Sequence, residues 1–255
     1  MTERPRLCFM ASHSTLAMEA AALLKGRYGQ HDEADADIIV ALGGDGFMLS
    51  TLHETQHLPA PVYGMNRGTV GFLMNAYAPD DLYERIAEAE EAVINPLRME
   101  ATDRAGATHS ALAINEVSML RMGPQAANLA ISIDGRERMA ELVCDGALVS
   151  TPAGSTAYNY SAHGPILPIG ADILALTAIS AYRPRRWRGA LLPSSAVVRF
   201  DVLEQEKRAV AATADSTEVR DVVSVTIRSE PKVAHRLLFD PGHGLEERLI
   251  REQFV

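Results

Sequence analysis

A single acidic residue, Asp45, stands among the three glycines Gly43, Gly44 and Gly46. Because glycine has no Cβ, the backbone of such a loop can turn sharply and its amides can approach a phosphate closely. A carboxylate in a phosphate-binding loop repels its ligand unless it holds a metal ion or takes a proton from a substrate hydroxyl. The loop therefore indicates phosphoryl transfer with Asp45 as a reacting group. A tight turn at the end of a strand is the purely structural alternative.

A second candidate site lies at residues 145–158, where an apolar strand that follows Asp145 runs into the loop Thr-Pro-Ala-Gly-Ser-Thr-Ala-Tyr at 151–158. We expect a short helix to begin at Ser155, where free backbone amides and hydroxyl groups can bind an anionic or ribose-bearing ligand. Tyr158 adds a flat apolar face with a polar tip. A capped turn between two β elements is the alternative interpretation.

A third candidate is the polar pair Asn115 and Glu116, which we expect to lie inside an apolar strand at residues 111–117. Adjacent residues on a strand face opposite ways, so at least one of the two side chains points toward the core or a cleft. A buried carboxylate needs hydrogen-bond donors, and ribose hydroxyls or an amine would supply them. An exposed edge strand is the alternative.

Two further motifs are interpreted as structural. His53 and His57 match the His-Glu-x-x-His pattern of zinc proteases, but no motif supplies a third ligand, and a solvated helix end before Pro59 accounts for them. The densest positive charge lies at residues 183–188, Arg-Pro-Arg-Arg-Trp-Arg. The cluster could attract ATP, but no glycine or hydroxyl loop adjoins it. Arginine and tryptophan are enriched at protein contacts, so we interpret it as part of a subunit interface or a structural network.

The elements that must position these residues differ between the two parts of the chain. Residues 1–96 alternate strand and helix patterns, which predicts a layered, Rossmann-like α/β domain with a mostly parallel sheet. The expected strands are at residues 7–11, 38–42 and 61–64, and the expected helices begin at Ser14 or Thr15, at Phe47 and at Pro79. The last of these helices carries Leu82, Ile86, Ala89 and Val93 on one face.

From residue 97 the apolar period changes from 3.6 to two. Apolar residues alternate with polar or small ones at residues 129–133 and 223–228, and Asp134 and Gly135 form a hairpin turn directly after the first of these strands. This pattern predicts an antiparallel β-sandwich over residues 97–232. A helical pattern returns at residues 245–254.

Charge and apolar runs exclude some partners. The formal net charge of −9 disfavours nucleic acids and anionic membranes, which bind basic surfaces. No stretch approaches the roughly 20 apolar residues that cross a bilayer, and the apolar run after Arg6 is too short for a signal peptide. Cys8 and Cys144 each lie in an apolar run, which predicts buried free thiols. We therefore expect a cytoplasmic protein.

The three candidate sites together resemble NAD kinase. The resemblance covers residues 43–46, the run Asn-Arg-Gly-Thr-Val-Gly-Phe-Leu at 66–73, residues 115–116 and the stretch 145–161. It implies two domains, residues 1–96 and 97–232, with a tail at 233–255 that returns to the first domain. It also implies transfer of the γ-phosphoryl group of ATP to the 2′-hydroxyl of the adenosine ribose of NAD, which gives NADP.

The resemblance assigns a role to each candidate residue. Asp45 looks like the general base and Gly46 like its backbone neighbour at the ligand, in the loop that Gly43 and Gly44 begin. The positions implied to contact the dinucleotide are Phe72 and Leu73 at the adenine, Asn115 and Glu116 at the ribose and adenine, Asp145 at the nicotinamide half, and Thr156, Ala157, Tyr158 and Ser161 in the loop that holds the dinucleotide.

The family also implies partners. It uses ATP or polyphosphate as donor and a divalent ion, Mg²⁺ carried by ATP, with no metal site of the protein's own. A homodimer or homotetramer in which one subunit's loop serves its neighbour is implied, with neither nucleic acid nor membrane as partner. Three positions depart from the family pattern: Phe47 in place of threonine, Val143 in place of arginine, and Thr217 in place of glutamine in Asp-x-Gln. The departure at Val143 leaves a preference for NAD or NADH open, and the departure at Thr217 leaves its contact with the ligand open.

Two other functions share part of the pattern. A lipid kinase of the diacylglycerol type has the Gly-Gly-Asp-Gly loop and two domains, but no basic amphipathic helix for docking on anionic lipid is evident here. A catalytically silent dinucleotide-binding regulator would not need a carboxylate aimed at phosphate, whereas this chain has Asp45 and Glu116.

Overall fold

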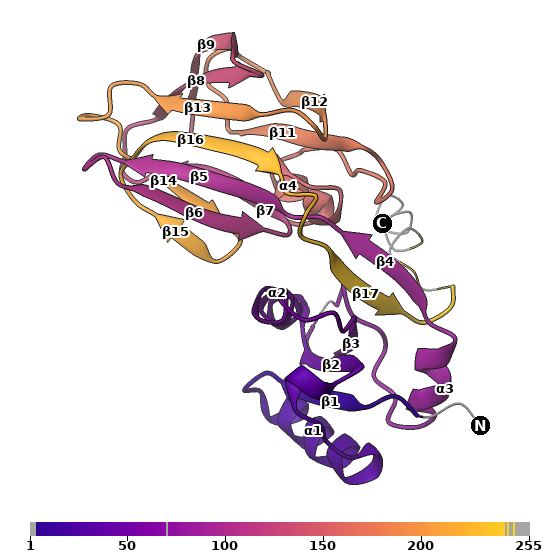
Figure 1. The fold of residues 1–255 in the computed structure, drawn as a ribbon. Helices are drawn as coiled ribbons and strands as arrows, with labels where there is room; N and C mark the ends of the chain where they lie inside the picture. Colours follow the sequence, from indigo (N-terminus) through magenta and orange to yellow (C-terminus); the bar gives the residue numbers. More distant parts are fainter. Residues whose placement is uncertain (1–3, 70, 243, 245–246, 248–255) are drawn as a thin grey trace. The chain divides into compact units, whose positions relative to one another are not determined.

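The computed structural model describes residues 4–69 and 71–242, together with residues 244 and 247. The chain divides into two compact units, one made of Met1–Ile94 with Val233–Val255 and the other of Asn95–Lys232 (Figure 1). The helix expected at residues 245–254 lies largely outside the described residues.

The first unit is built on a five-stranded sheet in the order β1-β2-β3-β17-β4. Its strands are β1 (Leu7–Ala11), β2 (Ile38–Gly43), β3 (Val62–Asn66), β17 (His235–Phe239) and β4 (Glu90–Ile94). Neighbours from β1 to β17 pair in parallel, and β4 runs antiparallel to β17. Every residue of β2 is buried, as expected for a central strand covered on both faces. The prediction of a mostly parallel sheet is confirmed.

Helices follow the first two strands. Helix α1 (Thr15–Tyr28) begins after Ser14, whose Oγ accepts a hydrogen bond from the Ala17 backbone N–H at 3.3 Å, as a capping residue does. A short 3₁₀ helix, η1 (Glu33–Asp35), precedes β2. Helix α2 (Asp45–Glu54) starts two residues earlier than expected, so Asp45 lies in its first turn.

The helix predicted after Pro79 is shorter than its apolar period suggested. Helix α3 (Leu82–Ala87) buries Leu82 and Ile86, but the chain then extends into β4, where Val93 is 50% exposed. The expectation that Ala89 and Val93 continue the helical face is wrong. β4 pairs with β17, a strand far away in the sequence, and this long-range pairing overrides the local period.

The second unit consists of two antiparallel six-stranded sheets, which confirms the predicted sandwich. One has the order β12-β11-β10-β7-β14-β15, with β12 (Gly189–Pro193), β11 (Ile173–Ile179), β10 (Gly146–Ser150), β7 (Glu116–Arg121), β14 (Val210–Ala214) and β15 (Thr217–Val219). The other has the order β6-β5-β16-β13-β8-β9, with β6 (Thr108–Ala113), β5 (Leu97–Asp103), β16 (Val222–Ser229), β13 (Val198–Val202), β8 (Ala127–Ile133) and β9 (Arg136–Cys144).

The apolar faces of both sheets contribute to one core, with Phe200, Met119 and Leu129 fully buried in it. The predicted hairpin turn joins β8 to β9. Asp134 and Gly135 have φ values of 52° and 72°, which are the left-handed values that a two-residue type I′ turn requires.

The strand expected at residues 111–117 is two strands. β6 ends at Ala113, β7 begins at Glu116, and the two belong to different sheets. Ile114 and Asn115 form the crossing between the sheets, so Asn115 lies outside any strand. The apolar residues on either side of the polar pair hid this break because both strands bury apolar residues in the same core.

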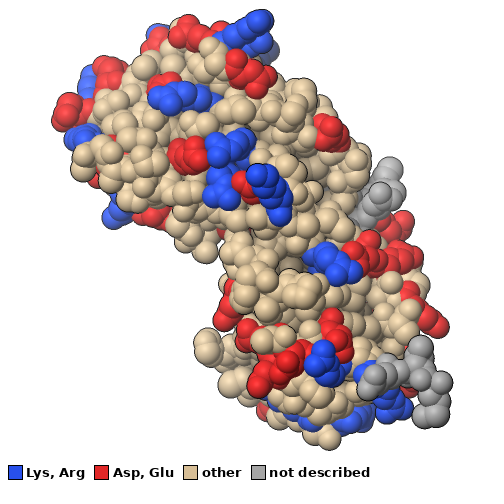
Figure 2. Space-filling view, viewed as in Figure 1, with Lys and Arg blue, Asp and Glu red and all other residues tan. Residues whose placement is uncertain are grey.

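The surface carries charges of both signs, and the two cysteines are buried. Figure 2 shows acidic and basic side chains interspersed on the displayed face. Cys8 and Cys144 are free and buried, as expected, and burial raises the pKa of the Cys144 thiol to about 12. Within the part of the chain that the structure describes, no helix has the length and apolar character needed to cross a membrane.

Candidate active site

The carboxylate of Asp45 is held by a second loop of the first unit. The backbone N–H groups of Gly71 and Phe72 donate to its Oδ2 at 3.1 and 2.8 Å, and that of Leu73 donates to Oδ1 at 2.7 Å. A carboxylate has about four lone-pair sites, so these three bonds from described residues leave one site free, on Oδ1. The amides therefore fix the orientation of the group and leave one acceptor position for another donor.

The two loops that meet at Asp45 follow the carboxyl ends of the adjacent parallel strands β2 and β3. The Arg67 backbone N–H donates to the Gly43 carbonyl oxygen at 2.6 Å. A Cβ added to Gly68 would lie 2.9 Å from the Gly44 Cα, so the loops are packed backbone to backbone. Open α/β sheets bind their ligands outside the carboxyl ends of their strands, which makes this pair of loops the first unit's candidate ligand site.

Glycine is required at further positions in these loops. Gly71 has φ = +84°, and a Cβ there would lie 2.4 Å from the Asn66 Nδ2. A Cβ on Gly43 would lie 2.7 Å from the Cβ of Phe47, so Phe47, which departs from the family pattern, packs against this glycine.

Two other predicted residues of these loops differ in their exposure. Gly46 is exposed, and a Cβ added there would meet none of the described atoms within 4 Å. Leu73 is 3% exposed, so what it offers at this loop is its backbone amide.

In the second unit, Asp215 holds the crossing between β6 and β7. Its carboxylate accepts hydrogen bonds from the backbone N–H groups of Ile114 at 2.7 Å and Asn115 at 3.0 Å. Asp215 has φ = 48° and lies in the turn between β14 and β15. Asp215 therefore positions the Asn115 backbone, and Thr217, two residues later, is exposed.

The loop that begins at Thr151 is fastened to the same crossing. Thr151 Oγ1 donates to the Ile114 carbonyl oxygen at 2.7 Å and accepts from the Gly154 backbone N–H at 3.0 Å. A Cβ on Gly154 would lie 2.2 Å from the Asn115 carbonyl oxygen. Only glycine allows this approach, so the loop and the Asn115 crossing form one packed unit.

The expected helix start at Ser155 is wrong. The structure has a 3₁₀ helix, η2 (Ala153–Thr156), followed by a one-turn helix, α4 (Tyr158–Ser161). Ser155 is buried, donates to the Pro152 carbonyl oxygen at 2.7 Å and accepts from the Leu167 N–H at 3.0 Å. Among the loop residues that are half-buried or exposed, and thus open to a ligand, are the predicted Thr156, Ala157, Tyr158 and Ser161.

Glu116 is the most electrostatically perturbed carboxyl group of this region. Burial raises its pKa to about 7, and the negative charge of Asp215 adds to the rise, while the Tyr158 backbone N–H opposes it. Its Oε2 is buried and has no hydrogen-bond partner among the described residues. A buried acceptor without a donor costs free energy, so this oxygen suits the hydroxyl or amine of a ligand.

Tyr158 lies within electrostatic reach of Glu116 and Asp145. The pKa of its phenol is raised chiefly by burial and then by the charges of those two carboxyl groups, so the hydroxyl stays neutral. Asp145 is itself paired: Arg121 Nε donates to its Oδ1 at 2.6 Å, and its side chain is 44% exposed. The structure thus brings together three of the predicted residues and adds Arg121, which no motif indicated.

Asn159 organises the loop from inside and was not predicted. It is fully buried, and its Nδ2 donates to the carbonyl oxygens of Ser155 at 3.1 Å and Pro165 at 2.9 Å. Its Oδ1 accepts from Thr177 Oγ1 at 2.6 Å. Asn159 lies in the stretch 145–161 that carries the resemblance, but its residue type alone does not indicate this role, because its partners lie on a loop and on β11.

In the structure, the end of a helix separates His53 from His57, and the basic cluster is attached to the sandwich core. Helix α2 ends at Glu54, so His53 and His57 do not share a helix face. In the described ranges no three His, Cys, Asp or Glu side chains gather as they would around a metal ion. In the basic cluster, Trp187 packs against the core of the sandwich, and the Arg183 carbonyl oxygen accepts from the Val143 N–H at 2.8 Å. Participation of the cluster in a subunit interface stays a prediction.

Comparison with known proteins decides the family. Residues 12–96 match the family model of the ATP-NAD kinase N-terminal domain, and residues 114–233 match that of the ATP-NAD kinase C-terminal domain. The chain belongs to the NAD kinase family. An NAD kinase of Cereibacter sphaeroides is 71% identical over 250 residues that cover 98% of both chains. One from Caulobacter vibrioides is 59% identical over 249 residues, which cover 98% of this chain and 96% of the relative.

Solved structures of NAD kinases share the fold. The structure of yeast NADH kinase complexed with NADH matches with a TM-score of 0.84 and 20% identity, over 99% of this chain and 88% of that one. An NAD kinase from Archaeoglobus fulgidus in complex with ATP matches with a TM-score of 0.73 and 24% identity, over 98% of this chain and 97% of that one. Together with the family models, they confirm the NAD kinase resemblance and the predicted fold class.

Proposed function

We propose that Asp45 is the general base of an NAD kinase reaction, in which the γ-phosphoryl group of ATP passes to the 2′-hydroxyl of the adenosine ribose of NAD. Phosphorylation of NAD follows from membership of the family. One observation carries the role of Asp45: three backbone amides orient its carboxylate and leave one lone pair of Oδ1 free. That lone pair is the acceptor for the hydroxyl proton.

The step balances without any further reactant. The ribose 2′ oxygen forms a bond to the γ-phosphorus, the bond from that phosphorus to the β–γ bridging oxygen breaks, and ADP leaves with the electron pair. The proton of the 2′-hydroxyl passes to Asp45. A positioned base of this kind contributes about 10²–10⁴-fold, and the remaining acceleration comes from positioning and neutralisation of charge.

The divalent ion of this reaction is proposed to be Mg²⁺ bound through the phosphates of ATP. Mg²⁺ commonly binds through one or two carboxylates together with substrate phosphates. The single free acceptor site on Asp45 is assigned to the hydroxyl proton, so the donor phosphates fit the ion better than this loop does. When bound, the ion neutralises charge that develops on the transferred phosphoryl group.

The second unit is proposed to bind the dinucleotide. Glu116 Oε2, buried and without a partner among the described residues, accepts from a ribose hydroxyl or the adenine amine, and the half-buried ring of Tyr158 packs against the ligand. Asn115 and Asp145 are proposed to contact the adenine-ribose and nicotinamide parts. The further proposed contacts are Gly43, Gly44, Gly46, Phe72, Leu73, Thr156, Ala157 and Ser161. A cytoplasmic homodimer or homotetramer with shared loops remains part of the proposal.

The test is an assay of the purified protein with ATP, Mg²⁺ and NAD, in which an NADP-specific dehydrogenase measures NADP. We expect NADP to form and expect no product from diacylglycerol in place of NAD. Polyphosphate in place of ATP, and NADH in place of NAD, identify the donor and the acceptor. Absence of NADP and NADPH with every donor would overturn the proposal, and a phosphorylated lipid product would favour the diacylglycerol kinase alternative.

A further inference from the structure

The loop that supplies the three amides to Asp45 is anchored at Asn75, two residues after Leu73. The Asn75 backbone N–H donates to the Gly64 carbonyl oxygen at 2.8 Å, and its carbonyl oxygen accepts from the Asn66 N–H at 2.8 Å. Asn75 is 1% exposed. The position of the amides at residues 71–73 therefore depends on how firmly this buried residue is held.

The Asn75 side chain fastens the loop to β17, which comes from the C-terminal part of the chain. Its Nδ2 donates to the Leu238 carbonyl oxygen at 3.0 Å, and its Oδ1 accepts from the Asp240 backbone N–H at 2.9 Å. A carboxamide supplies both a donor and an acceptor, which this pair of backbone partners requires.

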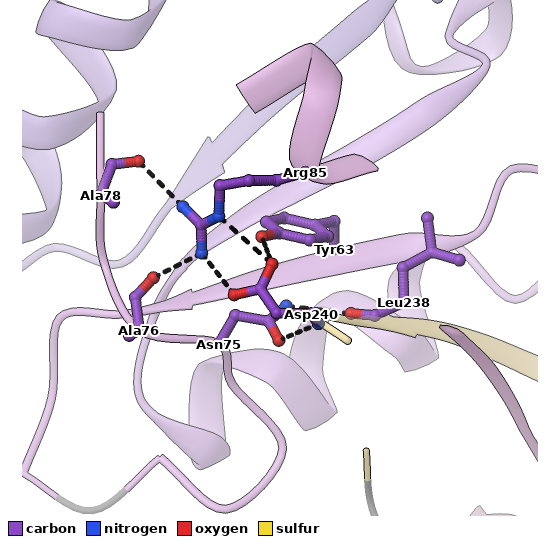
Figure 3. Close-up of polar contacts among 7 residues, drawn as sticks. All are labelled: Tyr63, Asn75, Ala76, Ala78, Arg85, Leu238 and Asp240. Atoms are coloured by element: carbon purple, nitrogen blue, oxygen red, sulfur yellow. Dashed lines mark hydrogen bonds and ion pairs between the residues drawn. The ribbon is translucent and has the colours of Figure 1, made fainter. Parts of the chain in front are cut away.

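The Asp240 carboxylate continues the network (Figure 3). Arg85 binds it through Nε at 3.2 Å and Nη2 at 2.5 Å, and the Tyr63 hydroxyl donates to its Oδ1 at 2.5 Å. Both charged side chains are 19% exposed. Burial and the neighbouring Asp240 raise the pKa of Tyr63, so its hydroxyl remains a donor.

Arg85 also holds the loop itself. Its Nη2 donates to the Ala76 carbonyl oxygen at 2.9 Å, and its Nη1 donates to that of Ala78 at 3.1 Å (Figure 3). The guanidinium group thus joins the carboxylate at the end of β17 to two carbonyl groups directly after Asn75. Bidentate arginine–carboxylate pairs are geometrically specific as well as strong.

We propose that Asn75, Arg85 and Asp240 form a clamp that positions Asp45 for the reaction by holding the amides of residues 71–73. This role rests on the proposed function of Asp45 as general base. The clamp acts on the carboxylate through the backbone of the loop that Asn75 anchors, so its three members are positioning residues. A displacement of about 1 Å at a reacting group can slow an enzyme by up to about 10²-fold, which makes such an anchor consequential.

The same strand offers a matched control. Arg236 on β17 binds Glu91 of β4 in a bidentate pair, with Nε–Oε1 at 2.9 Å and Nη2–Oε2 at 2.6 Å. Arg236 also donates to a carbonyl oxygen, that of Pro59, at 3.1 Å. This pair has the chemistry of the Arg85–Asp240 pair and also fastens β17, but it contacts β4 and residue 59 instead of the loop after Leu73.

The experiment compares Asp240→Asn with Glu91→Gln. For Asp240→Asn we expect kcat to fall about 10-fold while KM for NAD and ATP changes less than about twofold, because the clamp acts on the orientation of the base. Hydrogen exchange at the amides of Gly71, Phe72 and Leu73 should become faster. Glu91→Gln should leave kcat, KM and the exchange at residues 71–73 unchanged. Arg85→Lys keeps the positive charge but loses the planar guanidinium group that binds the carboxylate through two N–H groups. It provides a second variant if Asp240→Asn folds poorly.

The Asp45→Asn background separates this inference from the proposed function. If the clamp acts through Asp45, adding Asp240→Asn to Asp45→Asn should slow the enzyme by less than about twofold. An equal 10-fold slowing in both backgrounds, or unchanged exchange at residues 71–73, would overturn the clamp. Near-normal turnover of Asp45→Asn alone would overturn the general base, while faster exchange in Asp240→Asn would still support the structural coupling of clamp and loop.

Discussion

The Leu73 backbone N–H donates to Asp45 Oδ1 at 2.7 Å, although the two residues are 28 positions apart in the chain. This bond joins the loops that follow β2 and β3, and it directs the free lone pair of the same oxygen. A carboxylate on an exposed turn would sample several rotamers, whereas this one is fixed before substrate arrives. Preorganisation of this kind is a large part of what enzymes contribute to phosphoryl transfer.

Replacement of Asp45 by asparagine should separate binding from turnover. The change removes the negative charge and the acceptor for the hydroxyl proton while it keeps the size of the side chain, so turnover should fall about 10²-fold or more. NAD affinity, measured by calorimetry, should change little. A variant with nearly wild-type turnover would refute the role of Asp45 as base.

Replacement of Gly68 by alanine should slow the enzyme without unfolding it. The new Cβ would lie 2.9 Å from the backbone of Gly44, so the two loops must separate. We expect kcat to fall about 10-fold or more, because the separation moves the Asp45 loop relative to its amide donors. The matched control is Gly26→Ala in α1, where nothing described lies within 4 Å. Gly26→Ala should keep the rate and raise stability by up to about 1 kcal/mol; equal rates for both variants would contradict the prediction.

Glu116 should make stability depend on pH. Its folded-state pKa is about 7, above the ordinary value of 4.5, so between these values the native state binds more protons than the unfolded chain. The free energy of unfolding should therefore fall as pH rises from about 4.5 to 7 and level off above 7, a loss of a few kcal/mol at about 1.4 kcal/mol per unit.

Denaturant titrations at several pH values measure this dependence. Glu116→Gln, which cannot ionise, should flatten the curve over that window. Glu218→Gln, a change at an exposed position of β15, should retain the wild-type slope. A wild-type slope in Glu116→Gln would mean that other groups cause the dependence.

Replacement of Gly154 by alanine should destabilise the second unit. The Cβ would meet the Asn115 carbonyl oxygen at 2.2 Å, and both groups belong to a loop and a crossing that are tied by several hydrogen bonds. Overpacking of this kind costs about 1–3 kcal/mol, which thermal or denaturant unfolding would detect. Gly123→Ala, with no described atom within 4 Å, is the control and should leave the free energy of unfolding nearly unchanged.

Much of the fold could be predicted because the relevant information is local. The apolar run before Gly43, the Ser14 cap and the turn at Asp134 and Gly135 each specify their own geometry through burial, capping or positive φ. The helix predicted through Val93 was wrong because the structure at this residue depends on a distant segment. That residue lies in β4, whose partner β17 is some 140 residues later, and no local pattern encodes such a pairing.

Residue types and spacing alone indicated the family, through a carboxylate among glycines, a polar pair at Asn115 and Glu116, and a hydroxyl-rich loop. The contacts that hold these groups are seen only in the folded chain. The amide donors of Asp45, the Asp215 support of Asn115 and the clamp at Asn75 and Asp240 all join segments distant along the chain. Such bonds form because the sheet brings strand ends together, and backbone amides of any residue type can make them, so residue identities alone do not reveal them.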